Sequence, residues 1–134
     1  MILIDTSIWI ELFRDKSGRI LQIFRKRIKN DYYAITRFTQ IELLQGARDE
    51  ADWQKLEEYL ESQLYIEATE KTWRNAARIY FELRRKGLTI NSPIDCLIAE
   101  IAIESGSLLI HRDKDFIKIS KMKPLDSEYL ELHK

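Results

Sequence analysis

The chain has 134 residues, of which 45% are hydrophobic and 33% charged, a balance typical of one folded domain and not of a disordered or fibrous protein. Its 22 Lys and Arg residues equal its 22 Asp and Glu residues, so net charge supplies no general attraction to nucleic acid. The single cysteine, Cys96, excludes a disulfide within the chain and is typical of a reducing compartment. Without a leader-like segment or an apolar run of about 20 residues, we expect a soluble cytoplasmic protein that does not enter a membrane.

The N-terminal half alternates short apolar runs with helical patterns. Residues 2–4 predict a buried strand, which ends at Asp5, where a helix begins. Apolar residues at helical spacing then predict two helices in a hairpin, the second strongly basic. These apolar residues are Ile8, Trp9, Leu12, Phe13, Ile20, Ile23, Phe24 and Ile28. Residues 32–35 predict a second strand, followed by a helix that Gly46 ends.

The C-terminal half continues this alternation. A charged helix is expected over residues 49–62, then a third strand at 64–66 and a long amphipathic helix. Ser92-Pro93 opens an apolar helix, which leads into a buried strand at 108–110. The pattern predicts an α/β fold with a central parallel sheet flanked by helices. In such folds ligands bind beyond the carboxyl ends of the strands.

Four acidic residues stand at places where a carboxylate needs an explanation. Asp5 and Asp113 each follow a buried strand, so a parallel sheet would bring both to the same edge. Asp95 lies in the first turn of a helix, where the helix dipole favours an ionised carboxylate. Glu42 lies among apolar residues with no basic residue three or four positions away, and we expect it to be buried.

Four carboxylates gathered in one pocket would repel each other, and a divalent cation would relieve that repulsion. Mg²⁺ or Mn²⁺ accepts oxygen ligands, lowers the pKa of water and stabilises the charge that develops during in-line attack on a phosphodiester. The four residues therefore predict a metal-dependent phosphodiester hydrolase.

Each acidic residue also has a purely structural interpretation. Asp5 could cap the helix that follows the first strand, and Asp95 could form an S-x-x-D capping arrangement with Ser92. Asp113 and Asp115 could be ordinary turn residues. The residues alone leave these alternatives open.

Four segments taken together resemble the motifs of PIN-domain proteins, and more narrowly those of VapC-type toxins of bacterial or archaeal toxin–antitoxin pairs. The segments are I-D-T-S-I-W near the N-terminus, T-x-x-E-L-L-x-G at residues 39–46, D-C-L-I-A at 95–99 and L-L-I-H-R-D-K-D-F at 108–116. Their order and spacing match from residue 2 to about residue 126. Each motif alone is weak, whereas four in sequence are specific.

The resemblance implies a single Rossmann-like PIN domain over residues 1–134 that acts as a metal-dependent endoribonuclease and toxin. It also implies a homodimer, a cognate antitoxin that inserts into or covers the active-site groove, and RNA products with a 5′-phosphate. The family's acidic positions fall on Asp5, Glu42, Asp95 and Asp113, with Asp115 as a fifth contributor. Supporting hydroxyl positions fall on Thr6, Ser7 and Thr39.

Several basic runs could contact RNA, although such runs are more often solvated helix faces. Arg112 and Lys114 flank the expected site and are our RNA-contact candidates. Glu100 stands where the family pattern leads us to expect a small apolar residue. It lies about 140° around the helix from Asp95, so we expect it to face solvent or a partner protein.

The main alternative is a catalytically silent PIN-like module that binds a partner protein or assists promoter binding. A receiver-type phosphotransfer domain also uses carboxylates at strand ends, but it does not explain Glu42. A Ser-His-Asp hydrolase lacks its G-x-S-x-G motif here, and two histidines with one cysteine make a poor zinc site. We expect His111, at a strand end, to serve packing or RNA contact.

Overall fold

The computed structural model describes residues 1–133, which contain a four-stranded sheet in the order β2-β1-β3-β4. All its neighbouring strands are parallel, with Ile2 paired with both Tyr33 and Leu108, and Leu109 paired with Ser127. The strands are β1 (Ile2–Ile4), β2 (Tyr33–Ala34), β3 (Leu108–His111) and β4 (Ser127–Tyr129). The predicted parallel sheet is confirmed, and its carboxyl ends lie along one edge.

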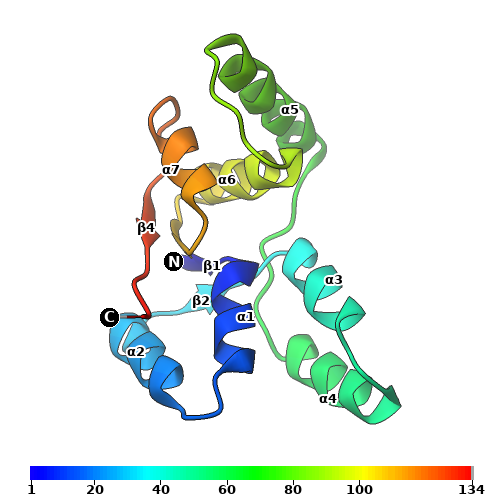
Figure 1. The fold of residues 1–134 in the computed structure, drawn as a ribbon. Helices are drawn as coiled ribbons and strands as arrows, with labels where there is room; N and C mark the ends of the chain where they lie inside the picture. Colours follow the sequence, from blue (N-terminus) through cyan, green and yellow to red (C-terminus); the bar gives the residue numbers. More distant parts are fainter. Residues whose placement is uncertain (134) are drawn as a thin grey trace.

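Seven helices flank this sheet within the described residues. They are α1 (Thr6–Arg14), α2 (Arg19–Ile28), α3 (Arg37–Gln45), α4 (Glu50–Glu61), α5 (Glu70–Arg85), α6 (Pro93–Ser105) and α7 (Lys114–Ser120). Helices α1 to α4 lie on one side of the strands, and α5, α6 and α7 lie on the other (Figure 1). Across residues 1–133, we find no helix with the length and apolarity needed to cross a membrane.

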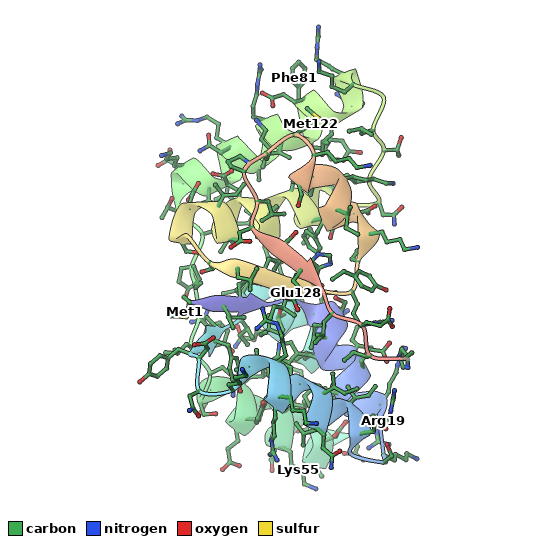
Figure 2. All side chains as sticks on the ribbon, turned by 90° about the vertical axis from the view of Figure 1, so that its left-hand side faces the viewer. Met1, Arg19, Lys55, Phe81, Met122 and Glu128 are labelled. Carbon is green, nitrogen blue, oxygen red and sulfur yellow. The ribbon has the colours of Figure 1, made fainter. Side chains whose placement is uncertain are left out.

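Alternating side chains of the strands supply two hydrophobic cores, one on each face of the sheet. Leu3 and Leu109 pack with buried residues of α5, α6 and α7, whereas Ile4 and Ile110 pack with α1, α2, α3 and α4. This division follows from the two-residue period of a strand. Figure 2 shows the sheet between the layers, with Phe81 and Met122 at one end of the view and Arg19 and Lys55 at the other.

The structure differs from one local expectation and contains two elements that were not expected. The predicted strand at residues 64–66 is reduced to one isolated bridge between Tyr65 and Ile35. Helix α7 was not predicted, because Asp113 resembles a turn residue while in fact its carboxylate caps this helix. Strand β4 was not predicted either, because its sequence Ser-Glu-Tyr is polar and only half-buried at the sheet's edge.

An ion pair joins strand β4 to helix α2. The guanidinium of Arg27, on α2, donates to the Glu128 carboxylate of β4 from Nε at 2.8 Å and from Nη2 at 2.6 Å. Both side chains remain about one third exposed, so solvent screens part of the attraction. This two-point contact nevertheless has the geometry in which an arginine–carboxylate pair is strongest.

Arg27→Gln is expected to lower the free energy of unfolding by about 1 kcal/mol, measured by urea denaturation at pH 7. Arg25→Gln, on an exposed position of the same helix, is the matched control and should change stability by less than about 0.5 kcal/mol. Equal losses in the two variants would contradict the assigned role of the Arg27–Glu128 pair.

Candidate active site

A cavity of about 230 Å³ lies where β1 and β3 end, and all four predicted acidic residues line it. The lining residues are Asp5, Thr6, Ser7, Ile10, Glu42, Ser92, Ile94, Asp95, Ile98 and Asp113. They come from the junction of β1 with α1, from α1, α3 and α6, from the segment just before α6 and from the turn after β3. The topology therefore brings together side chains that are more than one hundred residues apart.

Asp5 combines the structural and the functional interpretation. Its Oδ2 accepts hydrogen bonds from the backbone N–H of Ser7 at 3.0 Å and from the Ser7 hydroxyl at 2.6 Å, so Asp5 caps α1. Burial raises the pKa of Asp5, the Ser7 hydrogen bonds oppose that rise, and the charges of Glu42 and Asp113 add to it. A helix cap and a cavity-lining carboxylate are thus the same group.

The surroundings of Asp95 also oppose its ionisation. Burial raises its pKa to about 8, with further contributions from Asp113, Asp5 and Asp115. Ser92 caps α6 by accepting the N–H of Ile94, while Asp95 lines the cavity. The expected repulsion between the acidic groups is therefore present at Asp95.

Asp113 is placed by the turn between β3 and α7. Its Oδ1 accepts the N–H of Asp115 at 2.9 Å, which makes Asp113 the N-cap of α7. Its own backbone N–H donates to Nδ1 of His111 at 3.1 Å.

Asp115 lies next to the cavity with its carboxylate already engaged. Oδ2 accepts the N–H of Asn91 at 2.9 Å, and Oδ1 lies 3.5 Å from the ammonium of Lys118. Asp115 thereby ties the segment before α6 to α7. Its carboxylate thus has a structural role and also lies within 4.8 Å of those of Asp95 and Asp113.

The donor set fits a divalent cation. Carboxylate oxygens of Asp95, Asp113 and Asp115 lie within 4.8 Å of one another, and Asp5 acts on Asp95 electrostatically. Hard cations such as Mg²⁺ and Mn²⁺ prefer oxygen ligands of this kind. A bound cation would also favour the ionised form of Asp95, which burial and the neighbouring carboxylates disfavour.

The expectation that Glu42 is buried is wrong. Glu42 is exposed, and its neighbour Ile41 is 58% exposed, because the apolar residues of α3 are not confined to its buried face. The Glu42 carboxylate is instead positioned by a hydrogen bond, because the Thr6 hydroxyl donates to its Oε1 at 3.1 Å. The one Thr6 proton is used there, so the buried Thr39 hydroxyl donates to Thr6 at 2.9 Å.

At the end of β3, the structure corrects the expected RNA contact of Arg112 and, of the two roles expected for His111, supports packing. Only 15% of the Arg112 side chain is exposed, and its guanidinium donates to the carbonyl of Leu130 at 2.9 Å, so it is committed to the C-terminal segment. His111 is fully buried, which excludes RNA contact, and burial lowers the pKa of its ring to about 4. Lys114 is exposed at the start of α7 and remains the RNA-contact candidate.

The expectation that Glu100 faces solvent or a partner is also wrong, since it is 8% exposed. Helix α6 is covered by α5, and the Glu100 carboxylate accepts a weak 3.5 Å hydrogen bond from Asn75 of α5. Burial and a hydrogen bond with Glu104 raise the pKa of Glu100 to about 7. Glu100 is therefore part of the packing between two helices and does not line the acidic cavity.

A larger groove of about 860 Å³ adjoins the acidic cavity and shares Ile10 and Glu42 with it. Helix α1 forms one wall, and α3 with α4 forms the other. The groove residues are Ile10, Phe13, Arg14, Lys16, Glu42, Leu43, Gly46, Arg48, Asp52, Lys55, Leu56 and Tyr59. This lining combines apolar residues such as Phe13 and Leu56 with charged residues such as Arg14 and Lys55, a mixture that suits an amphipathic protein segment.

Sequence reasoning missed several contributors to the cavity. Ile94 and Ile98 line it together with Asp95. Their spacing of three and four residues from Ile98 places Asp95 and Ile94 on the same face of α6 as Ile98. Asn91, whose backbone holds Asp115, left no signal in the sequence, because a backbone donor has no residue type.

Comparison with known proteins agrees with this architecture. Residues 2–122 match the family model described as PIN domain, and the chain belongs to the PIN-domain family. Ribonuclease VapC11 of Mycobacterium tuberculosis is 36% identical over 131 residues, which cover 95% of this chain and 97% of that protein. Ribonuclease VapC51 of the same organism is 31% identical over 114 residues, or 85% and 81% of the two chains.

Solved structures show the same fold. The crystal structure of VapBC2 from Rickettsia felis bound to a promoter DNA fragment aligns with a TM-score of 0.76 at 24% identity, covering 98% of this chain and all of that one. VapBC-1 from nontypeable Haemophilus influenzae aligns with a TM-score of 0.77 at 24% identity, covering 96% and 97%. These matches extend over the sheet and both helical layers.

Proposed function

We propose that this protein is a divalent-metal-dependent endoribonuclease that acts as the toxin of a toxin–antitoxin pair. The observation that carries the proposal is the convergence of Asp5, Glu42, Asp95 and Asp113 on one cavity. The relatives named VapC ribonucleases, similar over nearly the whole chain, support RNA as the substrate.

In this proposal Asp5, Asp95 and Asp113 hold Mg²⁺ or Mn²⁺. When bound, the ion would acidify a water molecule and stabilise negative charge on the phosphate. Glu42 joins the metal ligands or orients the attacking water and accepts its proton, and Thr6 fixes the Glu42 carboxylate for that task. Water, and not a side chain or the ribose 2′-hydroxyl, attacks phosphorus and the 3′-oxygen leaves, so the products carry a 5′-phosphate and a 3′-hydroxyl.

We also propose that a cognate antitoxin segment occupies the groove between α1 and the α3–α4 pair and thereby covers Glu42. Its lining suits such a segment, and related folds occur in VapBC toxin–antitoxin complexes. We further infer that the chain forms one domain, because both cores share one sheet. A homodimer in the cytoplasm, where the proposed RNA substrate lies, completes the proposal.

The test is to sequence the RNA ends that the purified protein generates in total RNA with Mg²⁺ or Mn²⁺. We expect discrete cuts with 5′-phosphate ends, which disappear with Asp5→Asn although that variant remains folded. Full activity of Asp5→Asn would refute the metal-site assignment. A folded wild type that leaves every RNA intact would favour the silent interaction module.

Lys114 is expected to guide RNA by contact with a phosphate. In an Asp5→Asn background, Lys114→Gln should weaken binding of a labelled single-stranded RNA and reduce the slope of log K against log salt by about 0.7. Lys121→Gln, an exposed change at the other end of α7, is the control. An unchanged slope for Lys114→Gln would remove this residue from the RNA path.

A further inference from the structure

We infer that His111 is a positioning residue, whose ring nitrogen Nδ1 fixes the backbone of Asp113 and thereby aims the Asp113 carboxylate at the acidic cavity. The inference rests on the proposed metal-dependent function, to which it adds a residue with no direct contact to metal or RNA. It depends on three observations: the hydrogen bonds of the β3–α7 turn, the tautomer of the ring, and its burial.

The turn that carries Asp113 is held by consecutive hydrogen bonds. The N–H of Arg112 donates to the Ser7 hydroxyl at 2.9 Å, and that hydroxyl in turn donates to Asp5 at 2.6 Å. The next N–H, that of Asp113, donates to His111 Nδ1 at 3.1 Å. Ser7 thus links the turn to Asp5, whereas His111 acts directly on the backbone of Asp113.

These contacts fix the tautomer of His111. A backbone N–H can only donate, so Nδ1 carries a lone pair and the proton of the neutral ring lies on Nε2. Nε2 is buried and has no hydrogen-bond partner within residues 1–133. The ring itself is fully buried and packs against Phe116 and Tyr129, at centroid distances of 4.9 and 5.8 Å.

A buried N–H without a partner destabilises a fold. An aliphatic side chain could fill the same apolar space between Phe116 and Tyr129 without that cost, so packing alone does not account for a histidine here. What the imidazole supplies, and an aliphatic side chain cannot, is an acceptor for the N–H of Asp113. The stability lost at Nε2 is thus matched by a contact that serves the site.

Two substitutions separate positioning from packing. His111→Asn keeps an acceptor, because the Asn amide oxygen can take the place of Nδ1, but it leaves space in the core. His111→Leu fills the core and has no acceptor. If His111 positions Asp113, His111→Leu should weaken Mn²⁺ binding by about 10- to 100-fold, whereas His111→Asn should remain within about threefold of wild type. If His111 served packing alone, His111→Asn, which leaves space in the core, would weaken Mn²⁺ binding more than His111→Leu.

Three measurements on the intact chain test this: Mn²⁺ affinity by calorimetry, melting temperature without metal, and hydrogen exchange of the Asp113 amide by NMR. We expect His111→Leu, and not His111→Asn, to lose both Mn²⁺ affinity and protection of that amide. Of the two variants, His111→Asn should have the lower melting temperature. Equal Mn²⁺ affinity of the wild type and His111→Leu would overturn the inference and leave the proposed function intact. If neither the wild type nor either variant binds Mn²⁺, but His111→Leu alone loses protection of the Asp113 amide, the metal-dependent function fails and the positioning contact stands.

Discussion

Replacing Asp95 with Asn is expected to abolish RNA cleavage and to stabilise the metal-free protein at alkaline pH. Loss of one charged ligand removes several kcal/mol of charge stabilisation from the metal site, so kcat/KM should fall by about 10³-fold or more. Glu57→Gln, an exposed change on α4, is the matched control and should retain full activity.

The stability gain follows from the direction of the Asp95 pKa shift. Folding raises this pKa from 3.8 to about 8, so the folded protein holds a proton that the unfolded chain releases. Wild-type stability therefore decreases as pH rises from about 4 to about 8. The Asp95→Asn variant lacks this contribution, because its side-chain amide does not titrate in that range. The variant's advantage in melting temperature should widen over that window and stay constant above it. A constant difference from pH 4 to 8 would contradict the assigned pKa shift.

Mn²⁺ binding is expected to strengthen steeply with pH, because the cation must displace the proton of Asp95. One displaced proton makes the dissociation constant fall about tenfold per pH unit below the pKa of about 8. Affinity measured by calorimetry should thus rise by about 50-fold between pH 6 and pH 8, where half of Asp95 is ionised. At 100 times the dissociation constant, the ion should stabilise the fold by about 2.7 kcal/mol, or about 8 °C in melting temperature.

Removal of metal by EDTA should abolish cleavage and reverse this stabilisation, and added Mn²⁺ should restore both. Asp95→Asn serves as the comparison, since any residual Mn²⁺ binding should depend much less on pH. A wild-type affinity that is the same at pH 6 and pH 8 would show that no proton leaves Asp95 on binding.

The sequence predicts the central part of the fold well, because burial on both faces leaves a clear pattern. Residues 2–4 and 108–110 are short apolar runs that both form strands, and alternation with helical patterns predicts that they are parallel. Strand β4 could not be predicted in this way, because it lies at an edge and all three of its residues are only half-buried.

The acidic cavity could be predicted from strand order, since parallel strands place Asp5 and Asp113 at one edge. Burial of individual residues on helices was less predictable, as Glu42 and Glu100 show. Glu42 has apolar neighbours but lies on the exposed side of α3, whereas Glu100 lies where α5 covers α6. A helix sequence gives the period of its faces but not which neighbour covers each face.

The contacts that assemble the site join opposite parts of the polypeptide. The N–H of Asp5 donates to the carbonyl of Ile110, and the N–H of Arg112 donates to the hydroxyl of Ser7, 105 residues earlier in the chain. Closing so large a loop before any contact forms is slow and entropically costly. A partly folded molecule therefore has no assembled cleavage centre, and nuclease activity should appear during refolding only with the final cooperative phase.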